Sequence, residues 1–194
     1  MRRLSGWGRL PQAECRVQTA RNGGDVAAAI AQGPLIARGN GRAYGDPAMS
    51  PGLTLDMTAM DRFLSFDPET GTLVAEAGVL LADIIETFLP RGWFPWVTPG
   101  TKFVTLGGAI AADVHGKNHH KDGSFRSCVN WVEIADHEGE VFRLVRAVRS
   151  GEVSNNPFCS VLLTSWKRDT AVVREAISCG ADDVIIRPCS TSFA

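Results

Sequence analysis

The chain has 194 residues, of which 44% are hydrophobic and 21% charged, the composition of an ordinary globular protein rather than a disordered or fibrous one. Twenty Lys and Arg residues stand against twenty-one Asp and Glu residues, which gives a net charge of −1. We therefore expect no nucleic-acid partner, since no general basic field attracts one. The most hydrophobic stretch, 77–89, carries Asp83 and Glu86 and is too short to span a bilayer, so no transmembrane segment is expected.

The cysteines and the N-terminus indicate a cytoplasmic protein. The five cysteines are scattered without a C-x-x-C pair, which predicts reduced thiols rather than a zinc site or a disulfide framework. Arg2 and Arg3 are followed by Gly and Pro before any apolar run develops, so no secretory signal is expected.

Hydrophobic periodicity and the positions of Gly, Pro and Asp predict the elements of the first part of the chain. Helices are expected over 25–32 and 80–89, and strands over 34–37, 53–57, 63–66 and 72–77. The segment 53–57 alternates like an edge strand. By contrast, 95–125 is rich in Gly, Thr, His and small residues and resembles irregular backbone held close to a ligand.

The character of the sequence changes near residues 140–150. A strand over 129–136 leads through a turn at 137–140 towards a hairpin partner. From residue 141 the pattern predicts helix over 142–150 and 169–179 and strand over 160–164 and 184–187. Such alternation favours a parallel sheet, so we predict two domains, 1–140 and 141–194.

The first strand-to-loop junction carries a glycine-rich run, Arg38-Gly39-Asn40-Gly41-Arg42. Glycine lets backbone N–H groups approach anionic oxygens, because no Cβ intervenes and positive φ costs little. The glycines at 39, 41 and 45 do not follow the dinucleotide fingerprint of a Rossmann unit, and no helix clearly follows them. Taken alone, this run is explained equally well by a tight turn.

A second glycine-rich region strengthens the case for a ligand. Pro99-Gly100-Thr101 and Thr105-Leu106-Gly107-Gly108-Ala109 offer two more sites of close approach. Two phosphate-like cradles fit one large ligand better than two accidental turns. The alternative is that Gly107 and Gly108 allow a helix to pack against a strand.

The histidines at 115, 119 and 120 raise the question of a metal site. His115 and His119 are four residues apart, but Gly116 and Asn118 disfavour a helix between them and Lys117 would repel a cation. We therefore expect no metal and interpret the group as a cationic rim beside a ligand. For His119 and His120 a solvated surface role remains open.

At these residues the sequence resembles a known family, the FAD-linked oxidases of the vanillyl-alcohol oxidase or p-cresol methylhydroxylase type, and within it the decaprenylphosphoryl-ribose oxidases. The matching stretches are 6–9, 37–46, 99–101, 105–108, 110–120 and 124–125. The run 113–120, with the sequence Asp-Val-His-Gly-Lys-Asn-His-His, is the most specific of them.

The resemblance implies an α+β fold, a two-lobed FAD-binding domain, and three sets of cofactor contacts. The first set surrounds the pyrophosphate: Ala37, Arg38, Gly39, Asn40, Gly41, Arg42, Ala43, Tyr44, Gly45, Asp46 and Pro47. The second contacts the ADP and flavin: Gly100, Thr105, Leu106, Gly107 and Gly108. The third lies beside the isoalloxazine: Ala112, Asp113, Val114 and His115. Relatives with covalent flavin often carry histidine where this chain has Arg42, so FAD is expected to bind non-covalently.

The resemblance also implies a reaction and indicates that the substrate-covering domain of the relatives has no counterpart here. In complete relatives the flavin takes a hydride from the C2 hydroxyl carbon of a lipid-linked ribose, and His115 and Lys117 match positions on the substrate side. Nothing after Glu140 resembles the substrate-covering domain of the relatives. The domain is therefore expected to be incomplete, with a substrate domain or an electron acceptor supplied in trans.

The tail resembles the second half of a response-regulator receiver domain instead. The resemblance rests on 162–165, 176–184 and Arg187-Pro188, although a generic βα pair is an alternative. The receiver's phosphorylatable aspartate has no counterpart, so phosphotransfer is not expected. Two alternatives to a flavin-binding module follow: a receiver-derived signalling or interaction protein, and a non-functional fusion fragment whose incomplete sheets expose their edges.

Overall fold

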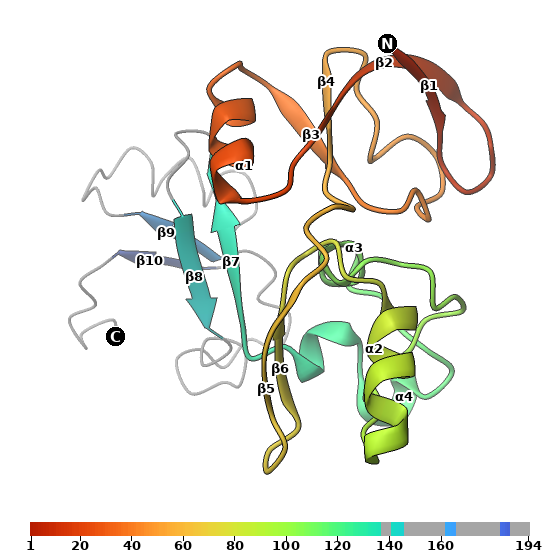
Figure 1. Cartoon of the computed structure of the whole chain (residues 1–194), viewed down its shortest axis with the longest axis vertical. Coiled ribbons are helices and arrows are strands. Elements are labelled where there is room, and N and C mark those ends of the chain that lie inside the picture. The colour runs from red at the N-terminus through yellow and green to blue at the C-terminus, as the bar shows by residue number, and fades with distance from the viewer. Residues whose placement is uncertain (137–140, 146–161, 166–182, 187–194) are drawn as a thin grey trace. The chain divides into compact units, whose positions relative to one another are not determined.

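The computed structural model describes residues 1–136, 141–145, 162–165 and 183–186 of the chain (Figure 1). These residues fall into two compact units, one comprising residues 1–129 and one beginning at Asn130. Each unit is described by itself below. None of the helices among the described residues has the length and apolar character needed to cross a membrane.

The first unit opens with a four-stranded sheet in the order β1-β2-β4-β3. The strands are β1 (Arg2–Ser5), β2 (Gln12–Thr19), β3 (Leu35–Arg38) and β4 (Leu53–Asp56). β1 runs antiparallel to β2, and β4 runs parallel to both β2 and β3. The helix α1 (Gly23–Ile30) contributes Ala29 to a small core with Leu53 and Leu55.

The prediction that 53–57 forms an edge strand is wrong, because β4 lies between β2 and β3. The alternation of apolar and polar residues that suggested an edge strand includes Thr54, which is fully buried. Its hydroxyl accepts a hydrogen bond from Ser50 N at 3.0 Å and donates one to Ser50 O at 3.1 Å. A satisfied hydroxyl can be buried, so the polar residue did not mark a solvent-facing side.

β1 and β2 were not predicted. β2 consists largely of polar residues, and only Cys15 within it is fully buried. Its strand conformation is fixed by neighbours on both sides: Cys15 lies opposite Arg2 in β1, and Arg16 lies opposite Leu53 in β4. Pairing partners far along the sequence leave no periodic signal in the strand itself.

The second part of this unit contains the hairpin β5 (Phe63–Asp67) and β6 (Thr72–Ala75) and the helix α2 (Leu81–Phe88), continued by a 3-10 turn η1 (Leu89–Arg91). The predicted strands and the predicted helix are confirmed. In Figure 1 α2 lies alongside the hairpin. Phe66, Leu73 and Ala75 of the hairpin pack against a buried core to which α2 contributes. That core consists of Val79, Leu81, Ile84, Phe88, Val97, Val104, Ala109 and Phe125.

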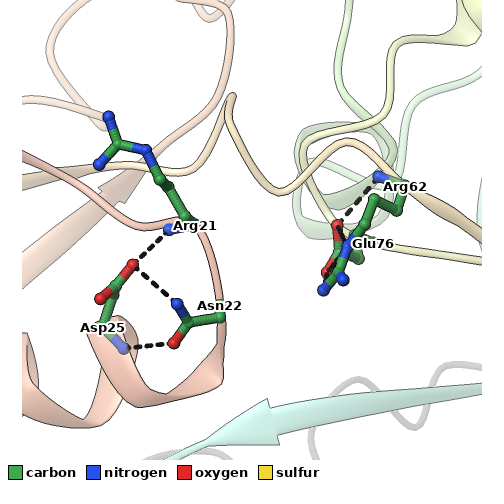
Figure 2. Close-up of polar contacts among 5 residues, drawn as sticks. All are labelled: Arg21, Asn22, Asp25, Arg62 and Glu76. Carbon is green, nitrogen blue, oxygen red and sulfur yellow. Dashed lines mark hydrogen bonds and ion pairs between the residues drawn. The ribbon is translucent and has the colours of Figure 1, made fainter.

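An ion pair holds the segment between β4 and β5 against the end of β6 (Figure 2). Arg62 Nη2 lies 2.7 Å from Glu76 Oε1, and Arg62 N donates to Glu76 Oε2 at 2.9 Å. The side chain of Glu76 is only 7% exposed. Hydrogen bonding from the Arg62 side chain holds the pKa of Glu76 below its ordinary value, because that bond favours the carboxylate.

The segment 95–125, predicted as irregular, contains short helices. These are α3 (Leu106–Ala111), α4 (His119–Asp122) and a 3-10 turn η2 (Phe125–Cys128). The glycines at 107 and 108 disfavour a helix locally. α3 forms nonetheless because Thr105 caps it and Ala109 is buried in the core.

The second unit contains two strand pairs. β7 (Trp131–Ala135) and β8 (Val141–Val145) form the predicted antiparallel hairpin, so the helix predicted over 142–150 is wrong over 142–145. Cross-strand pairing overrides the local helical pattern there. The predicted domain boundary after residue 140 falls directly before β8.

The tail contributes β9 (Leu162–Ser165) and β10 (Asp183–Ile186), which pair in parallel. Two strands were predicted here, over 160–164 and 184–187. The predicted helix 169–179, the 176–182 part of the receiver resemblance and Arg187-Pro188 lie outside the described residues. The resemblance to a receiver therefore stays a prediction.

Candidate functional site

The loop that follows β3 presents unpaired backbone donors. Gly41 and Gly45 have φ angles of 65° and 69°, in the left-handed region that favours glycine. Within the part of the chain that the structure describes, no backbone amide from Gly39 through Asp46 donates a hydrogen bond to a protein group. A run of amides without acceptors, bent by positive-φ glycines, is the geometry that binds anionic oxygens.

The residues that follow β1 contact this loop. The Cα of Gly6 lies so close to the loop that an added Cβ would be 2.3 Å from Gly45 O and 2.6 Å from Ala43 O. Trp7 N donates to Ala43 O at 2.8 Å. Both contacts use loop carbonyls, so the loop's amides remain free for a ligand.

The two arginines of the first loop have different roles. Arg38 donates through Nη2 to Ser5 O at 2.8 Å and through Nη1 to Ala48 O at 3.2 Å, which ties the loop to β1. Burial lowers the pKa of the Arg38 guanidinium. Two of its N–H groups are thus engaged in the fold, and the predicted contact of Arg38 with the pyrophosphate stays a prediction.

Arg42 has the opposite character. Its guanidinium carbon lies 4.8 Å from the centre of the Trp7 ring and 5.6 Å from the centre of the Phe103 ring. Its Nε is buried without a hydrogen-bond partner, and among the described residues no acceptor is found for its other N–H groups. A buried donor without an acceptor is costly, which points to an acceptor supplied by a ligand.

The two glycine-rich regions, predicted to serve one ligand, lie against each other. A Cβ added to Gly39 would be 2.2 Å from the Thr105 hydroxyl oxygen. Asn40 Nδ2 donates to Phe103 O at 2.9 Å. Residues more than sixty positions apart therefore form one continuous surface.

The start of α3 is engaged internally. Leu106 N donates to Val79 O at 2.7 Å, Gly107 N to Ala77 O at 2.8 Å and Gly108 N to the Thr105 hydroxyl at 3.2 Å. A Cβ on Gly107 would be 2.9 Å from the Ala77 Cβ. For Gly107 the geometry favours the packing alternative, because its amide has an acceptor and its Cα faces the end of β6.

The residues after α3 are held by Asp113. Asp113 has a φ of 42°, a left-handed conformation that Asp tolerates better than most residues. Its carboxylate accepts from Ser124 Oγ at 2.9 Å and Arg126 N at 3.0 Å, and pairs with Arg126 Nε at 3.0 Å. The side chain thus stabilises the 113–126 loop, and only the backbone of Asp113 is left for a cofactor contact.

The predicted substrate residues His115 and Lys117 are both exposed. The rings of His115 and His119 lie 5.2 Å apart, but His115 precedes α4, so the two do not share a helix. In the described residues no three His, Cys, Asp or Glu side chains gather as metal ligands do.

The segment 96–105 connects this histidine region with the first loop. A Cβ on Gly116 would be 2.4 Å from Thr98 O, and Asn118 Nδ2 donates to Trp96 O at 3.3 Å. Further along, the same segment contacts Gly39 and Asn40. The segment 96–105 thus contacts residues 116–118 near its start and residues 39–40 near its end. The predicted roles of Gly100, Ala112 and the 76%-exposed Tyr44 stay predictions.

Trp7 and Phe103 were missed as site residues. Trp7 belongs to the motif 6–9 that carries the resemblance, but aromatic residues give no periodic signal of a site. Trp7 is 50% exposed and Phe103 is 46% exposed. Only their position beside the Arg42 guanidinium indicates that they belong to the site.

These residues fit the diphosphate of a dinucleotide cofactor. A diphosphate offers several anionic acceptor oxygens, and the loop offers amides without acceptors and a guanidinium without a partner. At Gly39 and Gly41 an added Cβ would stand 2.2 Å from the Thr105 hydroxyl oxygen and 2.4 Å from Arg38 Nη2, so packing within the protein requires glycine at both positions.

Comparisons with known proteins identify the family of the chain. Residues 17–145 match the family described as the FAD binding domain. The chain is 41% identical over 154 residues to decaprenylphosphoryl-β-D-ribose oxidase of Mycolicibacterium smegmatis, covering 75% of this chain and 33% of that protein. It is 29% identical over 100 residues to D-lactate dehydrogenase of Anaerostipes hadrus, covering 52% and 21%.

A structural comparison supports the fold. The crystal structure of 6-hydroxy-D-nicotine oxidase from Arthrobacter nicotinovorans superposes with a TM-score of 0.62 at 19% identity, over 69% of this chain and 30% of that one. The chain thus spans about a third of the length of the oxidases it matches. With two thirds of its residues in the match, the chain belongs to the FAD binding domain family of oxidoreductases, and its cofactor is FAD.

Proposed function

We propose that residues 1–140 hold FAD non-covalently as the cofactor-binding part of an oxidoreductase that acts on a hydroxyl group. The observation that carries the proposal is the loop of residues 39–46, whose amides and Arg42 guanidinium have no acceptor in the described part of the protein. The diphosphate would be bound there, with Asn40 and Thr105 fixing the loop against the 100–108 segment.

Bound FAD supplies a hydride acceptor, which no protein side chain provides. The chain's own residues orient it and shape the substrate side. Asp113 fixes the turn after α3 through Ser124 and Arg126, and this turn delivers His115 and Lys117 to the surface. We assign these two residues to binding and polarising the substrate hydroxyl, since an imidazole and an ammonium donate hydrogen bonds to oxygen.

For the substrate we propose a lipid-linked ribose, because the relative with 41% identity is, by its name, an oxidase of decaprenylphosphoryl-β-D-ribose. The chain spans about a third of that protein. The proposal includes a substrate domain or an electron acceptor supplied in trans. Residues 141–194 would then lie outside the FAD-binding part.

The cofactor site is tested by titrating the flavin-free protein with FAD. The quenching of flavin fluorescence on binding gives the dissociation constant. Arg42→Met should weaken FAD about tenfold or more, because a hydrogen bond to a charged group contributes about 1.5–3 kcal/mol. Arg21→Met is the matched control, since Arg21 bonds to Asp25 through its backbone N (Figure 2) and its side chain makes no hydrogen bond or ion pair within the described residues. Equal affinities of both variants and the wild type would overturn the assignment of the loop.

The catalytic part is tested separately. The FAD-loaded protein is mixed anaerobically with decaprenylphosphoryl ribose, alone and with the purified C-terminal part of the relative, while the visible flavin band is recorded. Bleaching that needs both components and is lost in His115→Ala or Lys117→Ala supports the assignment. Bleaching that survives in both variants contradicts it.

A further inference from the structure

Arg42 carries a positive charge next to two aromatic rings from distant parts of the chain. Trp7 lies in the loop between β1 and β2, outside the residues 17–145 that match the family, and Phe103 precedes α3. Both rings lie within cation–π distance of the guanidinium carbon. A cation over an aromatic face is attracted to it without use of its N–H groups.

The two rings restrict the Arg42 side chain without neutralising its charge. A carboxylate partner would hold the guanidinium but would also consume its donors and cancel its charge. Among the described residues Arg42 has no carboxylate within ion-pair distance. The rings therefore restrict the side chain, while its charge is not neutralised and its N–H groups are not paired with protein acceptors among the described residues.

Trp7 is itself tied to the anion-binding loop. Its backbone N–H donates to Ala43 O, one residue beyond Arg42, and Gly6 lies against the carbonyls of Ala43 and Gly45. Phe103 is tied to the same loop, because its carbonyl accepts from Asn40 Nδ2. The backbone of each ring-bearing residue is thus tied to the loop by a hydrogen bond.

We infer that Trp7 is a positioning residue that holds Arg42 ready for the diphosphate and so sets the preference for FAD over flavins without a diphosphate. The inference rests on the proposed function of the loop. Trp7 acts through Arg42, so its loss should weaken ligands that carry the diphosphate, FAD and ADP, and leave riboflavin unchanged.

The experiment measures dissociation constants of FAD, ADP and riboflavin for the wild type, Trp7→Leu, Trp7→Phe and Arg42→Met. The expected result for Trp7→Leu is FAD and ADP weakened about three- to tenfold, the size of a cation–π contact, with riboflavin unchanged. Trp7→Phe keeps an aromatic face and should restore most of the affinity. Phe94→Leu removes another exposed aromatic ring and should change nothing.

The outcomes separate the inference from the proposed function. If the wild type binds neither FAD nor ADP, the function of the loop fails. If the wild type binds FAD and Arg42→Met weakens it, but Trp7→Leu does not, the role of Trp7 is wrong. An equal loss of all three ligands in Trp7→Leu, or no recovery in Trp7→Phe, also overturns it, because either result indicates general disruption. Thermal unfolding of each variant verifies that it is folded, and Arg42→Met/Trp7→Leu should be no weaker than Arg42→Met alone.

Discussion

Gly39 lies so close to Thr105 that a single added carbon would stand 2.2 Å from the Thr105 hydroxyl oxygen. Thr105 is 2% exposed, and its hydroxyl already accepts the hydrogen bond of Gly108 N at the start of α3. It therefore has little freedom to move away. The contact joins the anion-binding loop to the segment that precedes α3.

Gly39→Ala should destabilise the protein and weaken FAD. The new methyl group must displace either the loop or the buried Thr105, and overpacking of this kind costs about 1–3 kcal/mol. Urea unfolding gives the free energy, and FAD titration gives the affinity. Gly23→Ala is the control, because a Cβ there meets nothing within 4 Å. Equal free energies of unfolding and equal FAD affinities for the two variants would show that Gly39 and Thr105 are not tightly packed.

Asn22→Ala should lower stability without altering FAD affinity. Asn22 Oδ1 accepts from Asp25 N at 3.0 Å as the cap of α1, and Asp25 Oδ2 accepts from Arg21 N at 2.7 Å (Figure 2). Loss of such a cap costs about 1 kcal/mol. Asn22→Ser keeps an acceptor and should recover most of the loss. A change in FAD affinity at unchanged stability would contradict this separation of α1 from the cofactor loop.

The ion pair between Glu76 and Arg62 should make the stability of the fold decrease as the pH is lowered. Hydrogen bonding from the Arg62 side chain lowers the folded-state pKa of Glu76 below its ordinary 4.5. The carboxylate thus contributes stability that is present above pH 4.5 and is lost as pH falls through the lowered folded-state value. Thermal unfolding from pH 7 to pH 3 measures it. Glu76→Gln should be less stable at pH 7 and show a flatter profile, whereas Glu14→Gln, at an exposed position, should keep the wild-type profile.

FAD should be released by acid precipitation. Arg42 stands in the first loop, and a guanidinium does not form the covalent flavin bond that a histidine forms at this position in some relatives. After precipitation and centrifugation, the yellow colour is expected in the supernatant, with FAD identified by chromatography. Flavin that stays in the washed pellet would contradict non-covalent binding.

The local sequence determined the elements with strong periodicity and the kind of ligand. α2 follows from apolar residues at helical spacing, since Leu81, Ile84 and Phe88 must share one buried face. The hairpin β5–β6 follows from short apolar runs bounded by turn residues. The glycines at 39 and 41 indicated a tight turn or a close approach of the backbone to another group, because this property belongs to the residue itself.

Tertiary structure decided the rest, because it depends on partners that are distant in sequence. Nothing local distinguishes β4 as a central strand or makes β2 a strand at all; pairing on both sides does so. The same holds for the site. Two arginines four residues apart look alike in sequence, yet Arg38 is engaged by Ser5 and Ala48, whereas Arg42 lies between aromatic rings with its donors unpaired. Only the packing of residues 1–9 and 96–105 around the loop creates that difference, because a side chain's role is fixed by the acceptors within its reach.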